Sequence, residues 1–133
     1  MVLVDTNVIL DVIEDDPTWA DWSQEQLDRA ALNDVLIINP VVYAELSIAF
    51  HRIEELEAML AEAGLIVESI PREALFLAGK AFLQYRRQKG TKQGVLPDFF
   101  IGAHAAILGI PLLTRDAGRY AHYFPRLTLV TPG

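Results

Sequence analysis

Four carboxylates stand where the chain passes from one expected element to the next. Asp5 directly follows the apolar run Val2–Val4, and Asp116 comes shortly after another apolar run. Asp98 opens an expected helix after a proline, and Glu45 lies near the start of a second helix among apolar neighbours. Converging acids need a counter-ion, since burial and like charges raise carboxylate pKa values. A hard divalent cation such as Mg²⁺ resolves that conflict, because it prefers carboxylate and water oxygens.

Each acid also has a purely structural interpretation. An aspartate at a helix start often caps it, because its side-chain oxygen accepts from unpaired backbone N–H groups. This interpretation applies to Asp98 and Asp116, while Asp5 could open a turn and Glu45 could point to solvent. Asp98 and Asp116 are nevertheless the only acids in residues 80–133, and each lies next to an element end. Their placement favours a shared acidic site.

The elements that must position these acids alternate along the chain. Strands are expected in five short apolar runs, at 2–4, 35–38, 65–67, 111–113 and 127–130. Helices are expected over 18–31, 41–63, 72–88 and 98–108, with a short one running from Asp116 through Tyr123. Strands without polar alternation, separated by helices, indicate a parallel sheet covered on both faces. The sequence therefore predicts an α/β fold, a three-layer α/β/α sandwich with a parallel sheet of about five strands. Ligands of such sheets bind beyond the carboxyl ends of the strands.

Length and composition narrow the class of protein. The 133 residues, 52% of them hydrophobic, predict a single domain over 1–133 with a substantial core. The absence of cysteine excludes disulfides, thiolate nucleophiles and Cys-ligated zinc, and it suits a reducing cytoplasm. No run is long and apolar enough to be a membrane span or a signal peptide. We therefore expect a soluble, cytoplasmic protein with no membrane partner.

Charge is distributed unevenly along the chain. The net charge is −7, yet residues 1–79 hold 16 acids and three bases, whereas residues 80–133 hold eight bases and two acids. A basic half inside an acidic average is compatible with a polyanion-binding side. The candidate RNA-binding residues in that half are Arg86, Arg87, Lys89, Lys92, Arg115 and Arg119. The alternative is that these side chains are solvated ends of helices.

Four sequence motifs in order resemble the PIN domain, and more narrowly the VapC-type ribonuclease toxins of toxin–antitoxin pairs. They are Val4-Asp5-Thr6-Asn7, Tyr43-Ala44-Glu45-Leu46, the stretch Leu96-Pro97-Asp98-Phe99-Phe100-Ile101-Gly102-Ala103-His104-Ala105, and Leu113-Thr114-Arg115-Asp116. The resemblance covers nearly the whole chain, including the closing stretch from Tyr120 to Pro125.

That resemblance implies a Mg²⁺-dependent endoribonuclease with catalytic acids at Asp5, Glu45, Asp98 and Asp116. Mn²⁺ is a possible substitute for Mg²⁺. Asp5 and Asp98 would hold the principal ion, while Glu45 and Asp116 would position water or bind a second ion. In the family, the residues at Thr6, Asn7 and Thr114 help to orient the carboxylates. The resemblance also implies a homodimer and a cognate antitoxin whose C-terminal segment enters the active-site groove.

Rival functions remain open at this stage. A haloacid-dehalogenase-type phosphatase also begins with an Asp after its first strand, but it needs a second Asp where this chain has Asn7. A receiver domain needs an acidic pair before a phosphorylatable Asp, an arrangement that the strand ends do not offer. A non-catalytic interaction module with the same fold is the alternative from a different class. Cleavage of RNA that depends on Mg²⁺ would separate the enzyme from this module.

Overall fold

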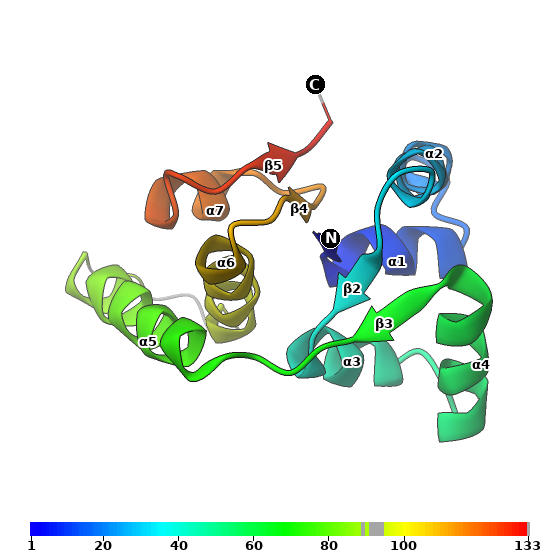
Figure 1. Cartoon of the computed structure of the whole chain (residues 1–133), viewed down its shortest axis with the longest axis horizontal. Coiled ribbons are helices and arrows are strands. Elements are labelled where there is room, and N and C mark those ends of the chain that lie inside the picture. Colours follow the sequence, from blue (N-terminus) through cyan, green and yellow to red (C-terminus); the bar gives the residue numbers. More distant parts are fainter. Residues whose placement is uncertain (89, 91–94, 133) are drawn as a thin grey trace.

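The central feature of the computed structural model, which describes residues 1–88, 90 and 95–132, is one parallel sheet (Figure 1). Its strand order is β3-β2-β1-β4-β5. The strands are β1 (Val2–Val4), β2 (Leu36–Ile38), β3 (Leu65–Val67), β4 (Leu112–Leu113) and β5 (Leu129–Val130). The described helices are α1 (Thr6–Ile13), α2 (Ala20–Ala31), α3 (Pro40–Ser47), α4 (Ile53–Ala63), α5 (Arg72–Arg87), α6 (Leu96–Leu108) and α7 (Gly118–Tyr123). The predicted three-layer α/β/α sandwich is confirmed.

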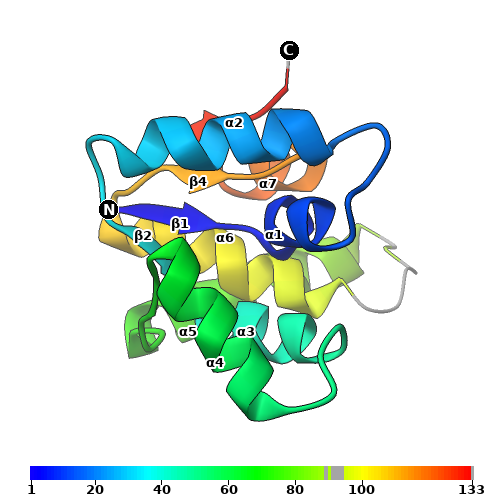
Figure 2. The same cartoon turned by 90° about the vertical axis from the view of Figure 1, so that its right-hand side faces the viewer.

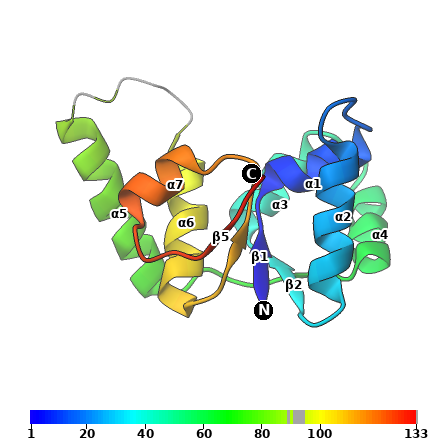
Figure 3. The same ribbon diagram turned by 90° about the horizontal axis from the view of Figure 1, so that it is seen from above.

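The helices cover the sheet on both faces. Helices α1, α2 and α4 lie on one face, which is turned toward the viewer in Figure 2, and α5, α6 and α7 lie on the other. Seen from above, the strands run between these two helical layers (Figure 3). The chain changes faces between β3 and β4, so β1 and β4 are the neighbouring strands whose following helices lie on opposite faces. Parallel sheets open a crevice at such a point, beyond the carboxyl ends of the strands.

Burial explains why the central strands lack polar alternation. Every residue of β1, β2 and β4 is buried, and Leu3, Ile37 and Leu113 have no exposed surface. Helix α6 contributes Phe99 and Ile101, which are also fully buried, to the same core. These apolar contacts fix the ends of β1, β4 and α6, the elements that carry three of the four candidate acids.

The prediction of one long helix over residues 41–63 is wrong. The chain instead forms α3 and α4, separated at residues 48–52. The Ser47 hydroxyl donates to the Ala44 carbonyl at 2.6 Å, a local bond that competes with helix continuation. Arg52 is extended before α4, and Phe50 between the helices packs on the core, while Ile48 is 87% exposed. The break lets Phe50 reach the core.

Helix α1 was not expected, and α6 begins two residues before the predicted start at Asp98. Residues 6–13 are rich in β-branched side chains, which have lower helix propensity. Packing overrides that propensity, because Val8 and Ile9 are buried in the core. Within the described residues, no helix is long and apolar enough to cross a membrane.

Candidate active site at the carboxyl ends of β1 and β4

Asp5 is the centre of the site because four donors converge on its carboxylate. It caps α1, with Oδ1 accepting from the Thr6 backbone N–H at 2.7 Å. Its Oδ2 accepts from the Thr114 hydroxyl at 2.8 Å and from the Tyr120 hydroxyl at 3.0 Å. Asn7 Nδ2 lies 3.5 Å from the same oxygen. Asp5 therefore both caps α1 and presents a buried carboxylate at the carboxyl end of β1.

Glu45 reaches the site from α3. The Asn39 side chain caps this helix through the Val42 backbone N–H at 3.0 Å, and Pro40 occupies its first turn. The Thr6 hydroxyl donates to Glu45 Oε1 at 2.6 Å. This bond ties α3 to the start of α1, and Glu45 lines the same pocket as Asp5.

Asp98 lies in the first turn of α6, and its carboxylate does not cap the helix. The Arg119 guanidinium, from α7, donates to Asp98 Oδ2, and the Tyr120 hydroxyl lies 3.5 Å from Asp98 Oδ1. The capping interpretation of Asp98 is therefore wrong. Its partners come from a helix 21 or 22 residues further along the chain.

Asp116 and Thr114 follow β4. The Asp116 backbone N–H donates to the Thr114 hydroxyl oxygen at 3.1 Å, and Asp116 Oδ1 accepts from the Gly118 N–H at 3.3 Å. Asn7 joins this loop to α1, since its Oδ1 accepts from the Arg115 N–H at 3.2 Å. Thr114, which is fully buried, thus connects Asp116 to Asp5 through one hydroxyl.

The four acids share one open pocket of about 210 Å³. Besides Leu10, its lining consists of Asp5, Thr6, Asn7, Glu45, Asp98, Asp116 and Tyr120. The structure therefore brings together residues from four separate segments of the chain, as the sequence predicted. The lining also includes Tyr120, which the sequence did not identify as a site residue.

Burial is the main cause of the shifted pKa values in this pocket. Burial, with the Asp98 carboxylate nearby, raises the pKa of Asp5 to about 6, although the Thr114 and Tyr120 hydroxyls oppose the shift. Burial also raises the pKa of Glu45, and Asp98 adds to that effect. The pKa of Asp98 is raised by burial even though the Arg119 guanidinium lowers it. Burial and the Asp5 carboxylate keep the pKa of the Tyr120 phenol well above 10.

This donor set fits a hard divalent cation. Carboxylates, the ligands that Mg²⁺ prefers, line the pocket, and a cation would relieve the raised pKa values. Among the residues that the structure describes, no three His, Cys, Asp or Glu side chains stand close enough together to enclose an ion as they lie. Mg²⁺ usually binds proteins through one or two carboxylates and retains several waters. A pocket that offers pairs of carboxylates therefore suffices for it.

The candidate RNA-binding bases occupy different environments. Arg115 donates to Asp11 through Nε at 2.8 Å and through Nη2 at 3.0 Å, and Arg119 pairs with Asp98. Arg86 and Arg87 are exposed in the last turn of α5. Lys89 and Lys92 lie outside the described residues. Arg86 and Arg87 are thus the described candidates whose charge faces solvent.

Sequence reasoning did not identify Tyr120 or Asp11. Tyr120 lies four residues after Asp116, but α7 begins only at Gly118, so the helical spacing rule does not link the two residues. Asp11 is 3% exposed and also accepts from the Ser23 hydroxyl at 2.8 Å, so it joins α1, α2 and the loop after β4. Nothing in its local sequence distinguishes it from the neighbouring acids Glu14, Asp15 and Asp16.

Two other residues of α6 have packing roles near the site. His104 is fully buried, with Nδ1 lying 3.2 Å from Asn39 Nδ2, so it packs in the core and not in the pocket. Gly102 permits close packing beside the site. A Cβ built on Gly102 would lie 2.5 Å from the Phe124 ring and 3.0 Å from the Tyr120 ring.

Comparison with known families identifies the class of protein. The sequence matches the PIN domain over residues 2–124. The chain therefore belongs to the PIN domain family, which makes a nuclease the activity expected of its acidic pocket. Comparison with curated proteins finds no significant match.

Solved structures with the same fold come from bacterial toxin–antitoxin complexes. One chain of VapBC2 from Rickettsia felis, solved with a DNA fragment from its promoter, matches with a TM-score of 0.76 and 20% identity, covering 100% of both chains. A chain of VapBC-1 from nontypeable Haemophilus influenzae gives 0.72 and 20%, covering 98% of each chain. A chain of a toxin–antitoxin complex from Klebsiella pneumoniae gives 0.68 and 22%, covering 100% of this chain and 98% of that one. At these identities the likeness establishes the fold.

Proposed function

We propose that this PIN domain protein is a Mg²⁺-dependent endoribonuclease and the toxin of a toxin–antitoxin pair. One observation carries the proposal: Asp5, Glu45, Asp98 and Asp116 line a single pocket where β1 and β4 end. Burial raises the pKa of three of these acids, Asp5, Glu45 and Asp98, so bringing them together costs folding free energy and points to a functional role. A metal-dependent phosphodiesterase provides one.

Asp5 and Asp98 would hold the principal ion, and Glu45 and Asp116 would position water or a second ion. When bound, the metal would lower the pKa of a water, orient it for in-line attack and neutralise charge on the scissile phosphate. Asp5 and Asp98 are suited to this because both are partly or fully buried and share Tyr120 as a neighbour.

Thr6, Asn7 and Thr114 would fix the carboxylates in place. Thr6 holds Glu45, and Thr114 holds Asp5. Asn7 spans both strand ends, because its amide contacts Asp5 and Thr114 and its oxygen accepts from Arg115. A ligand set held by hydrogen bonds reorganises little when a substrate binds.

RNA is the proposed substrate, and the basic second half would contact its backbone. Helix α5 ends beside α7, since the Tyr123 hydroxyl donates to Gln88 Oε1 at 2.8 Å. Arg86 and Arg87 therefore lie on the same side of the sheet as α7, which carries Tyr120 of the pocket lining and Arg119, the partner of Asp98. Guanidinium groups there would bind flanking phosphates.

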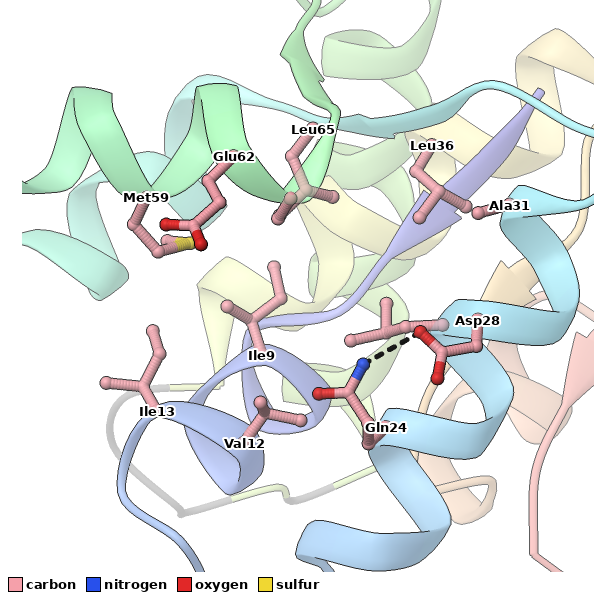
Figure 4. A pocket seen from close by; sticks show the side chains of 12 residues that line it. Ile9, Val12, Ile13, Gln24, Asp28, Ala31, Leu36, Met59, Glu62 and Leu65 are labelled. Atoms are coloured by element: carbon pink, nitrogen blue, oxygen red, sulfur yellow. Dashed lines mark hydrogen bonds between the residues drawn. The ribbon is translucent and has the colours of Figure 1, made fainter.

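An antitoxin is the proposed protein partner, and an open apolar cleft offers it a place. The cleft, of about 390 Å³, lies between α1, α2 and α4 (Figure 4). Ile9 and Ile13 from α1, Met59 from α4 and Leu65 from β3 point into it, with Asp28 at its edge. An amphipathic segment with apolar anchors and basic flanks would fit it. The solved chains with this fold come from toxin–antitoxin complexes, which supports such a partner.

We also propose that the protein is a single domain that acts in the cytoplasm as a homodimer. Exposed apolar side chains on α5, including Phe76 at 68% and Leu83 at 41%, are available for a second copy.

The proposal is tested by incubating the purified protein with a mixed RNA. Cleavage should require Mg²⁺ or Mn²⁺, stop on addition of EDTA, and return when excess Mg²⁺ is restored. A protein that binds its antitoxin but never cleaves RNA under any divalent cation would instead be the non-catalytic interaction module.

A further inference from the structure

We infer that Arg119 is a built-in counter-cation that competes with the divalent ion for Asp98 and must release this carboxylate when the ion binds. The inference rests on the proposed metal-dependent function. Arg119 is in the first turn of α7, and its guanidinium donates to Asp98 Oδ2. The Arg119 side chain is 20% exposed and that of Asp98 is 30% exposed, so the pair is largely sheltered from solvent.

Both oxygens of Asp98 already lie beside polar groups of α7. Oδ2 accepts from Arg119, and Oδ1 lies 3.5 Å from the Tyr120 hydroxyl. A metal ion needs a lone pair on one of these oxygens at close range. The guanidinium and the ion would then be neighbours of like charge at a partly buried site, which is unfavourable. The two cations therefore exclude one another at Asp98.

The arrangement of the acids agrees with this competition. They line one pocket, yet no three of the described carboxylates and imidazoles stand close enough to enclose an ion. Asp98 faces Arg119, and Asp5 faces Thr114 and Tyr120. The acids are thus held by donors of the protein, and a metal ion must replace at least one of them.

The Tyr85 ring offers the guanidinium a favourable contact after it leaves Asp98. The Arg119 guanidinium carbon lies 5.9 Å from the centre of the Tyr85 ring on α5, a distance at which a cation is attracted to the ring face. An arginine retained at the pocket edge is placed to contact a phosphate oxygen of the substrate. Arg119 would therefore neutralise Asp98 before the ion binds and be free for the substrate afterwards.

The test is a Mn²⁺ titration of four proteins at about pH 7.5: wild type, Arg119→Gln, Arg119→Lys and Arg126→Gln. Arg126 is an exposed arginine and serves as the control. Removing the competing charge should tighten Mn²⁺ binding by about tenfold in Arg119→Gln, the size typical of coupling between two ligands. Arg119→Lys, which keeps the cation, should bind close to wild type, and so should Arg126→Gln.

Equal or weaker Mn²⁺ binding by Arg119→Gln would overturn the inference, as would equal tightening in Arg119→Lys. Thermal unfolding in EDTA checks that each variant is folded. If wild type shows Mg²⁺-dependent RNA cleavage while Arg119→Gln shows no gain in Mn²⁺ affinity, the inference alone fails. If neither wild type nor Arg119→Gln binds Mn²⁺, the proposed metal site fails together with the inference.

Discussion

The Tyr120 hydroxyl lies between two carboxylates of the pocket, 3.0 Å from Asp5 Oδ2 and 3.5 Å from Asp98 Oδ1. A phenol has one proton to donate, and the shorter contact assigns it to Asp5. This contact joins α7 to the end of β1 across 115 residues of chain. Tyr120 is therefore a structural support of the acidic pocket, and it lacks any local sequence signal of that role.

Replacing Tyr120 with Phe should destabilise the metal-free protein, and more so at about pH 7.5 than at about pH 5. Loss of a hydrogen bond to an ionised group costs about 1.5–3 kcal/mol, and Asp5 is mostly protonated at the lower pH. Urea unfolding at both pH values measures the difference. Tyr123→Phe is the control, because the Tyr123 hydroxyl donates to the exposed Gln88 side chain. An equal loss at both pH values for Tyr120→Phe would contradict the assigned bond.

Stability without metal should fall as pH rises from about 4 to about 6. The folded state keeps a proton on Asp5 up to about pH 6, whereas the unfolded chain loses it near 3.8. Between these values the folded state binds more protons, so Asp5 lowers the free energy of unfolding by up to about 3 kcal/mol once it is ionised.

Added Mn²⁺ should reverse much of that loss. The ion needs the ionised carboxylate, so it should raise the melting temperature more at about pH 7.5 than at about pH 5. Melting curves with Mn²⁺ and with EDTA across this range provide the measurement. A Mn²⁺ effect that is independent of pH would show that Asp5 is not a ligand.

Gly102 and Gly79 offer a matched pair of substitutions to Ala. A Cβ on Gly102 would lie within 3.0 Å of two aromatic rings, whereas a Cβ on Gly79, which is on α5, meets nothing within 4 Å. Gly102→Ala should therefore lower the free energy of unfolding by about 1–3 kcal/mol through overpacking. Gly79→Ala should raise it by about 0.5–1 kcal/mol because alanine favours the helix. Denaturant unfolding of both variants compares them, and a neutral Gly102→Ala would show that Phe124 and Tyr120 can move aside freely.

The basic residues between Arg86 and Lys92 should contact phosphates. Replacing Arg86, Arg87, Lys89 and Lys92 with Ala should weaken RNA binding and flatten its salt dependence, with each lost contact changing the log–log slope by about 0.7 for a single strand. Cleavage-site preference should change little, because phosphates carry no sequence information. RNA affinity at several salt concentrations, measured with Asp98→Asn as the inactive background, gives the slope.

The control for this experiment replaces Arg29 and Arg52, which are exposed and paired with Glu25 and Glu54. The slope of this control should match that of the parent. An unchanged slope in the fourfold variant would mean that the basic cluster does not touch RNA.

The sequence predicted the sheet and the positions of the acids because both depend on local order. Asp5 and Asp116 each follow a buried apolar run, and the topology of a parallel sheet brings such ends to one edge. The pairing of Asp98 with Arg119 could not be predicted from the sequence, because it depends on how α7 packs against α6. The capping rule predicted a helix start at Asp98, whereas the helix begins two residues earlier and turns this carboxylate into the pocket.

Local propensity also failed where packing dominates. The β-branched stretch after Asp5 forms α1 because Val8 and Ile9 fill the core. Apolar residues recur at helical spacing over 41–63, so the sequence pattern did not indicate the break between α3 and α4 that lets Phe50 pack on the core. In both regions the tertiary contacts, which a single sequence does not display, decided the outcome.

RNA cleavage by the isosteric variant Asp98→Asn tests the central claim most directly. The substitution keeps the size of the side chain and removes an anionic oxygen ligand. The matched control is Asp21→Asn, at an exposed position on α2. With Mg²⁺ present and both variants shown to be folded, the account predicts that Asp21→Asn cleaves RNA like wild type and that Asp98→Asn has lost at least about 100-fold in rate, as for loss of an essential charged group at a catalytic centre. Wild-type cleavage by Asp98→Asn would contradict it.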